Sequence, residues 1–392
     1  MINEINSLSP QLSSYESEDA ASVMPKNSGD LEPDSKLNAN EGSEEATGNL
    51  QDALAGDANE KHSMPQLPSE ILTQIQQHAT EDTANNMSVA NKFMRDAVNA
   101  NVKSVTLKEP DGRIRGKGAA LSEAGSTFRS TKNVTLKGEA FKNGHLGDLT
   151  SFKALQSVTL DRNDVTGDIF SKLPRDLQSV RVVGLGKVED DQLKDLPPNL
   201  KTFASLGVNI TADSIKNLPR KMESLGILDD TRNVPTITGT ETYPPNLKRV
   251  LIASRGMNDL GIPDLPKNIK QMDLLATGVT GSSIKNIPES VHTLGLPFSY
   301  KNMDGLKDLS KNVHTLTISG RADSHGIDVS DDVIKSLPRT VRNLSLVGDV
   351  SPERLQKLRT NNPGVNITTV SEADYMGKVT SGLRGKGDFA FS

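Results

Sequence analysis

Two histidines at matching positions are the first residues of this chain whose type and spacing could support chemistry. His292 and His314 each precede a similar apolar segment by the same distance. If these segments pair as parallel strands, the two imidazoles lie about 4.7–4.9 Å apart, which permits a two-histidine metal site. The alternative is a solvated column, because the equivalent positions elsewhere are Gln156, Gln178, Lys201, Glu223, Lys248, Lys270 and Arg342. The polar character of that column favours the solvated interpretation.

Other candidates for chemistry are weaker. Asp323 and Asp328 flank His325, but they belong to an insertion that bulges from the surface, where no burial shifts a pKa. The Gly116-Lys117-Gly118 string lacks the spacing of a phosphate-binding loop. The absence of cysteine excludes disulfides, thiolate metal sites and cysteine nucleophiles. We therefore expect no catalytic residues, no metal and no cofactor, and a protein that is not an enzyme.

The elements that must position any functional side chain form a tandem repeat. Ser-Ile-Lys-Asn-Leu-Pro at 214–219 returns as Ser-Ile-Lys-Asn-Ile-Pro at 283–288, and each copy precedes an apolar-x-x-apolar-x-apolar run. The middle apolar residue of the run recurs every 22 to 29 residues, at Val105, Val134, Val158, Val180, Phe203, Leu225, Val250, Met272, Leu294, Leu316, Leu344 and Ile367. These intervals are typical of leucine-rich repeats.

The repeat predicts an α/β fold, a leucine-rich-repeat solenoid of about 11–12 repeats with a parallel concave sheet. The last two apolar residues of each run are two positions apart, so in a strand both point to one face. A further apolar residue three positions before the Leu-Pro pair closes a return arm over that face, at Phe170, Leu193, Ile215, Ile262, Ile284, Leu306 and Ile334. Proline then stops the arm before the strand.

Composition divides the chain into four parts, with expected boundaries at 1–63, 64–101, 102–370 and 371–392. Residues 1–61 carry 13 acidic and 3 basic residues without apolar periodicity, which predicts a disordered tail. This tail is either a solubilising segment or a secretion signal, since it resembles the Ser- and Asn-rich leaders of bacterial type III effectors. No apolar run is long enough for a transmembrane helix, and no signal peptide is evident. Residues 371–392 are too few for a further domain and are expected to be a C-terminal tail.

Residues 64–101 resemble an F-box. The resemblance rests on Leu-Pro-x-Glu-Ile-Leu-x-x-Ile at 67–75 and on Met-Ser-Val-Ala-Asn-Lys-Phe-x-Arg at 87–95. It implies binding to the Skp-type adaptor of a cullin ubiquitin ligase through Leu67, Pro68, Ile71, Leu72, Ile75, Val89 and Phe93. The alternative is an amphipathic cap that seals the first repeat, which every repeat array needs.

Joined to Leu-Pro-type repeats, this segment is similar in architecture to the F-box and leucine-rich-repeat type III effectors of plant-associated bacteria, the GALA-like proteins. The resemblance implies a secreted effector that acts in the host cell cytoplasm or nucleus. There it would recruit a host Skp-cullin ligase and hold a target protein on its concave face. A second hypothesis is a non-enzymatic interaction protein that binds and blocks a host protein.

The concave sheet is the predicted target-binding surface. The residues before and after each middle apolar residue point away from the core, and most are Ser or Thr. Larger and charged side chains concentrate near the centre, and exposed Arg beside an apolar residue is typical of interface anchors. The predicted target-binding residues are Arg181, Arg249, Leu251, Gln271, Asp273 and Asn343. Nucleic acid is not expected as a partner, because stacking aromatics are scarce, and neither is a membrane.

Overall fold

The structure of the protein is a computed structural model. It describes residues 102–108, 125–126, 128–137, 149–161, 169–187, 191–210, 212–228, 243–254, 256–275, 277–297, 305–319 and 329–384. The F-box-like segment, the N-terminal tail and the insertion with His325 lie outside these residues, as does the Gly116–Gly118 string. The predictions made for them stay predictions.

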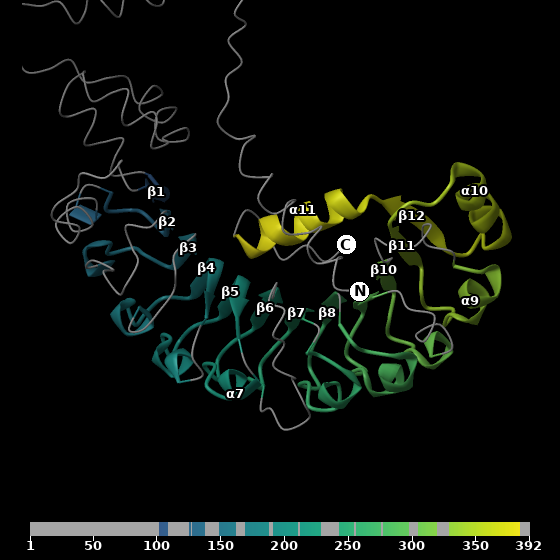
Figure 1. Ribbon diagram of the computed structural model, residues 1–392, viewed down its shortest axis with the longest axis horizontal. Helices are drawn as coiled ribbons and strands as arrows, with labels where there is room; N and C mark the ends of the chain where they lie inside the picture. Colours follow the sequence, from purple (N-terminus) through teal and green to yellow (C-terminus); the bar gives the residue numbers. More distant parts are fainter. Residues whose placement is uncertain are drawn as a thin grey trace, which may run out of the picture. The chain divides into compact units, whose positions relative to one another are not determined.

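One parallel sheet runs through the described repeats, with its strands in sequence order (Figure 1). The strands are β1 (Ser104–Lys108), β2 (Asn133–Lys137), β3 (Ser157–Asp161), β4 (Ser179–Lys187), β5 (Thr202–Asn209), β6 (Ser224–Leu228), β7 (Arg249–Ala253), β8 (Gln271–Leu275), β9 (Thr293–Pro297), β10 (Thr315–Ser319), β11 (Asn343–Val347) and β12 (Asn366–Val370). Ten of the strands contain the expected apolar-x-apolar run, and β5 and β12 have a polar residue, Ser205 or Thr369, at its last position. The predicted leucine-rich-repeat solenoid is thereby confirmed.

The strand register is the one that the repeat predicts. The middle apolar residues pair with one another across all neighbouring strands, from Val105 with Val134 at one end to Leu344 with Ile367 at the other. A parallel sheet shifted by one residue would turn every core side chain to the opposite face, so burial of one face fixes the register.

The return segments are short helical turns, and the solenoid core separates them from the sheet. They are η3 (Leu149–Ser151), η4 (Phe170–Lys172), η5 (Gln192–Asp195), α7 (Ala212–Ile215), η6 (Asp259–Gly261), η7 (Gly281–Asn286), η8 (Leu306–Asp308) and α9 (Asp331–Ser336). Leu173, Leu196, Ile287 and Leu337 end four of them with ψ between 133° and 148°. Each precedes a proline, which disfavours helical geometry in the residue before it.

The solenoid core lies between the sheet and these turns. All seven predicted return-arm residues are buried, with exposure of 3% or less. Phe170 and Phe203 from neighbouring repeats meet edge to face, with ring centroids 6.5 Å apart. Aliphatic side chains fill most of the remaining core, so stacked repeats bury an apolar face that one repeat alone leaves exposed.

The last part of the described chain departs from the repeat. After β11, helix α10 (Pro352–Asn361) precedes β12, and the chain then turns into α11 (Glu372–Leu383). Figure 1 shows the strands lining the inner, concave side of the repeat array, with α11 lying across that side. The expected C-terminal tail therefore contains a helix that contacts the sheet, including β5. Among the described helices none is both long and apolar enough to cross a membrane.

Candidate functional site

The concave face of the sheet changes character along the array. Ser and Thr predominate on the outer strands, whereas the middle strands carry apolar side chains on this face. We call the latter the concave apolar cluster, which consists of Val183, Ala204, Leu206, Leu228, Leu251, Ala253 and Leu275. All seven side chains are buried, yet none belongs to the solenoid core on the other face. The middle strands therefore carry apolar side chains on both faces, which a solenoid does not need for its own stability.

Helix α11 packs against the concave face above these strands. Its apolar side chains Tyr375, Val379 and Leu383 are spaced at i, i+4 and i+8, which places them on one face of a helix, and all are buried. Ser371 caps the helix by accepting a hydrogen bond from the Asp374 amide at 3.0 Å. The opposite face is polar, with Asp374 and Lys378 exposed. Helix α11 is thus amphipathic, and its apolar face meets the sheet.

The length of α11 matches the group of strands that it covers. Tyr375 contacts Asp273 on β8, and the helix also contacts β5. The eight helical steps from Tyr375 to Leu383 span about 12 Å at 1.5 Å per residue. Three strand spacings from β8 to β5 span about 14 Å. One helix face can therefore reach from β8 to β5.

A buried polar contact fixes α11 over β8. The Tyr375 hydroxyl donates a hydrogen bond to Oδ2 of Asp273, and both side chains are almost fully buried. Burial raises the pKa of Asp273 to about 6, although the hydrogen bond from Tyr375 opposes the shift. Burial beside this carboxylate also raises the pKa of Tyr375. Oδ1 of Asp273 accepts no hydrogen bond from any described residue. The docked helix therefore covers a carboxylate that prefers water.

Gly295 on β9 leaves the space that the Asp273 carboxylate occupies. A Cβ at position 295 would lie 2.3 Å from Oδ1 of Asp273. Position 295 pairs with Asp273 in the sheet, so a side chain there would meet the carboxylate directly. The glycine is thus required by close packing on the concave face.

The structure separates the predicted target-binding residues into two groups. Arg181, Arg249 and Gln271 are half-buried and Asn343 is exposed, as expected for a concave surface. Leu251 and Asp273, in contrast, are 0% and 2% exposed. The physical reason is α11, because Asp273 binds Tyr375 and Leu251 is its neighbour in the adjacent strand. Their role in binding a target stays a prediction.

The two arginines of this set are held against the sheet. Arg249 Nε donates to the Ser224 hydroxyl at 3.1 Å. Arg181 Nη1 donates to the Ser157 hydroxyl at 3.2 Å, and burial lowers the pKa of this guanidinium. Hydroxyls of the preceding strands therefore orient both side chains along the face.

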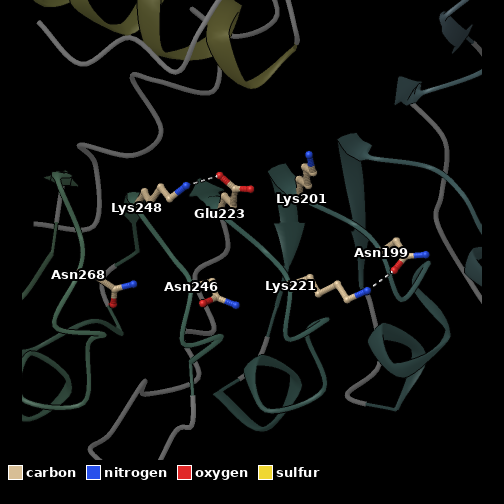
Figure 2. Close-up of a pocket in the computed structure, with 7 residues that line it drawn as sticks. All are labelled: Asn199, Lys201, Lys221, Glu223, Asn246, Lys248 and Asn268. Atoms are coloured by element: carbon tan, nitrogen blue, oxygen red, sulfur yellow. Dashed lines mark hydrogen bonds and ion pairs between the residues drawn. The ribbon is translucent and has the colours of Figure 1, made fainter.

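An open polar groove lies at the N-terminal ends of strands β5 to β8 (Figure 2). Its lining residues come from successive repeats and are Asn199, Lys201, Lys221, Glu223, Asn246, Lys248 and Asn268. Lys248 forms an ion pair with Glu223 at 2.7 Å, and Lys221 donates to Asn199 Oδ1 at 2.7 Å. Three lysines against one glutamate give the groove a net positive charge, which suits an acidic or polar segment of a partner.

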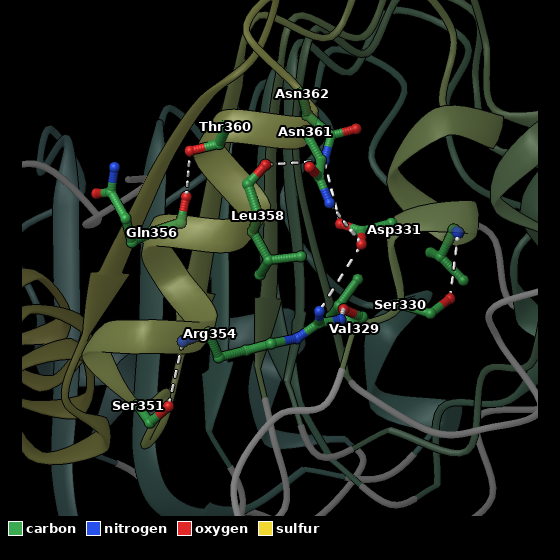
Figure 3. A network of polar contacts seen from close by, with 11 residues as sticks. Val329, Ser330, Asp331, Ser351, Arg354, Gln356, Leu358, Thr360, Asn361 and Asn362 are labelled. Carbon is green, nitrogen blue, oxygen red and sulfur yellow. Dashed lines mark hydrogen bonds and ion pairs between the residues drawn. The ribbon is translucent and has the colours of Figure 1, made fainter.

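A polar network holds the helix α10 that leads into β12 and α11 (Figure 3). Arg354 donates to the Val329 carbonyl at 2.6 Å and lies 3.8 Å from Asp331, which also accepts from Asn361 at 3.0 Å. Ser351 caps α10 by accepting from the Arg354 amide. Because α10 is tied to the start of α9 in this way, the start of α11 is fixed relative to the last repeats.

Of the residues proposed for chemistry from the sequence, the structure describes His292 and His314. His292 and His314 are both exposed, as the solvated-column interpretation predicts. Within the described residues, no group of three or more His, Asp or Glu side chains could hold a metal ion. Asp259 accepts hydrogen bonds from Thr280, Ser282 and Ser283, which joins two neighbouring return segments.

Sequence reasoning missed Tyr375, Val379 and Leu383. Two signals mark them. Ser371 and Asp374 have the spacing of a helix N-cap, and apolar residues at i, i+4 and i+8 follow. The repeats carry the second signal. Positions 206, 228, 253 and 275 are apolar, although the alternation of each strand places them on the concave face, away from the solenoid core.

Comparisons with known proteins find similar folds at low identity. No protein-family model matches the sequence, and no curated protein matches it. Among solved structures, the leucine-rich-repeat-containing protein LegL7 from Legionella pneumophila is 15% identical, with a TM-score of 0.42 over 73% of this chain and 98% of that chain. CroV588, described as a circular leucine-rich-repeat protein, is 12% identical with a TM-score of 0.41, over 64% of this chain and 39% of that one. A complex of TLR13 with single-stranded RNA gives 13% identity and a TM-score of 0.36, with 37% of that chain covered. The leucine-rich-repeat fold of this chain therefore rests on its sheet, register and return segments.

Proposed function

We propose that this chain is a protein-binding leucine-rich-repeat protein that holds a target protein on its concave face. The observation that carries the proposal is the concave apolar cluster, which lies on the face opposite the solenoid core. Apolar area of this kind, flanked by oriented arginines, is typical of protein interfaces. Arg249 and Gln271 lie beside the cluster and remain half-buried.

The polar groove at the N-terminal ends of β5 to β8 extends this proposed surface. Lys201 and Lys248 are exposed and directly precede strands β5 and β7. Charged residues at the rim of an interface mainly guide encounter and orientation, whereas the apolar centre supplies most of the affinity. A target with an acidic segment beside an apolar one fits this arrangement.

The finer proposal is an adaptor role. The F-box resemblance at 64–101 supports recruitment of a host Skp-type adaptor through Leu67, Pro68 and Ile71. The chain would then bring the target to a ubiquitin ligase by proximity, with no chemistry of its own, as a secreted effector in the host cytoplasm or nucleus. The alternative is that the same repeats bind and block a host protein while 64–101 only cap the solenoid.

Site-specific photo-crosslinking tests the concave proposal. A photoreactive amino acid at Asn343 of the full-length chain should label a target protein in host extract, and the labelled protein is identified by mass spectrometry. Arg249→Ala with Gln271→Ala should reduce the yield of that adduct at least fivefold. Lys335→Ala, an exposed change on the return side of the array, serves as the control. An adduct that persists unchanged in the double variant would place the target elsewhere.

A pull-down with purified plant Skp-type adaptor tests the adaptor role separately. The full-length chain should retain the adaptor, and Leu67→Ala with Pro68→Ala should lose it while circular dichroism of the repeats stays unchanged. No retention at micromolar protein leaves the blocking hypothesis in place.

A further inference from the structure

Helix α11 shows what kind of ligand the concave apolar cluster accepts. We propose that the concave face is a receptor for an amphipathic helix of the target protein, and that α11 occupies this receptor until the target helix replaces it. The inference rests on the proposed function and adds the form of the ligand and the competition with α11. Its basis is the burial of Tyr375, Val379 and Leu383 on a sheet face outside the solenoid core.

The receptor exists without α11. Its residues belong to strands whose backbone pairing is completed by the neighbouring strands of the solenoid. The core on the other face holds those strands whether or not the helix is present. Because preformed grooves bind amphipathic helices through anchors at i, i+4 and i+8, the concave face needs no rearrangement to accept a second helix.

The contacts between α11 and the sheet are few. In the part of the chain that the structure describes, one side-chain hydrogen bond joins α11 to the sheet, from Tyr375 to Asp273. The other side-chain bonds of the helix are local, such as Thr380 to the Met376 carbonyl at 2.8 Å. Three apolar side chains and one hydrogen bond therefore hold α11 on the sheet. A longer or more apolar helix would make more contacts with the same strands.

The composition of α11 also weakens it. Gly377 and Gly382 lie within the helix, where glycine is less favourable than alanine because it loses more backbone freedom on folding. No neighbouring atom requires the glycine at 377, because a Cβ there would meet nothing within 4 Å. Docking also removes the Asp273 carboxylate from water with one oxygen unpaired among the described residues. These features keep α11 replaceable.

The receptor also defines the chemistry of the helix that replaces α11. Three apolar side chains at i, i+4 and i+8 should cover the cluster from β8 to β5. A hydrogen-bond donor at the first position, such as Tyr or Lys, should face Asp273. A cation there would form an ion pair with Asp273, which the Tyr375 hydroxyl does not.

The test uses a fluorescein-labelled peptide with the sequence of residues 371–384 and measures its binding to full-length chains by anisotropy. In the native chain α11 competes with the peptide as a tethered ligand. The apparent affinity of the peptide is therefore its intrinsic affinity multiplied by the fraction of chains in which the receptor is open. Val379→Asp should release α11, because it places a carboxylate in the buried apolar face of the helix. We expect the peptide to bind the Val379→Asp chain at least tenfold more tightly than the native chain.

Matched controls make the result specific to the receptor. A peptide of the same composition in scrambled order should not bind. Adding Leu251→Glu to the Val379→Asp chain should abolish binding of the native-sequence peptide, while circular dichroism reports intact repeats. Leu383→Asp is a second releasing variant in case Val379→Asp perturbs the fold.

Two outcomes overturn the inference. One is no peptide binding to either releasing variant with folded repeats, and the other is equal binding to native and released chains. In both cases the crosslinking experiment at Asn343 still decides the proposed function, since it does not require a helical ligand.

Discussion

The Tyr375 hydroxyl donates a hydrogen bond to the Asp273 carboxylate, and the two residues are 102 positions apart in the sequence. This contact joins a helix outside the repeats to the centre of the concave sheet. It places a buried carboxylate under α11, so the strength of docking depends on both a hydrogen bond and a protonation equilibrium.

Replacing Gly377 with alanine should strengthen α11. The added Cβ has open space around it, and alanine favours a helix over glycine by about 0.5–1 kcal/mol. Hydrogen exchange of residues 371–384 should therefore slow by about two- to fivefold. Gly364→Ala is the matched control, because its Cβ also meets nothing but lies outside α11. Equal slowing of α11 exchange in both variants would contradict this explanation.

Docking of α11 should weaken as the pH rises. Burial raises the pKa of Asp273 from 3.8 to about 6 in the docked state, and release of the helix returns it toward 3.8. The stabilisation is therefore complete below pH 3.8 and is lost as the pH rises through 6. Linkage predicts about tenfold more exchange protection of α11 at pH 5 than at pH 7.5, relative to unstructured peptides at each pH.

Asp273→Asn is the control for this pH dependence. The amide keeps an oxygen that accepts from Tyr375 but carries no charge, so protection of α11 should change much less with pH over the same range, with Glu372, whose pKa burial also raises, as a remaining titrating group of the helix. It should also exceed that of the native chain at pH 7.5. A pH response in the variant as large as in the native chain would assign the effect to another group.

Gly295→Ala should loosen α11 without altering the helix itself. The new Cβ would lie 2.3 Å from Oδ1 and 2.6 Å from Cγ of Asp273, so the carboxylate must turn away from Tyr375. Loss of a buried hydrogen bond costs about 1 kcal/mol or more, which corresponds to at least about fivefold faster exchange of α11. In a Tyr375→Phe background the same substitution should cost less, because the bond is already absent. Additive effects would exclude this route.

The stability of the solenoid should depend on Phe170. It is fully buried and contacts Phe203 of the next repeat edge to face. Phe170→Ala should reduce the free energy of unfolding by about 3–5 kcal/mol, because it removes apolar contacts and leaves a cavity. Urea unfolding followed by circular dichroism measures the change, with the exposed Lys153→Ala as the control. A loss no larger than that of the control would show that the site repacks.

The solenoid was predictable because its information is local. Each repeat contains the sequence signals of its own strand and return arm. The middle apolar residues, from Val105 in the first repeat to Ile367 in the last, therefore define the register without any long-range contact. Pairing of those residues in neighbouring strands confirms the prediction. Proline after the arm likewise acts on the residue directly before it.

The concave site was predictable only in part. The alternation of the strands placed Arg249, Leu251, Gln271 and Asp273 on one face, in agreement with the pairing of β7 and β8. Their exposure depends on α11, whose anchors lie outside the repeat and meet strands about a hundred residues earlier. The apolar concave positions indicate that these strands are covered, but no repeat pattern identifies α11 as the segment that covers them, because a helix can dock on any apolar surface of matching length.

Hydrogen exchange of the full-length native chain tests the central claim most directly, by comparing amides of 371–384 with those of β8. If α11 is a replaceable ligand of the concave face, its amides exchange through local opening, at least about tenfold faster than β8 amides, which β7 and β9 hold. Leu383→Ala should then accelerate exchange of α11 alone. Exchange of α11 at the rate of β8, with both accelerated equally by Leu383→Ala, would show instead that the helix is an inseparable part of the fold.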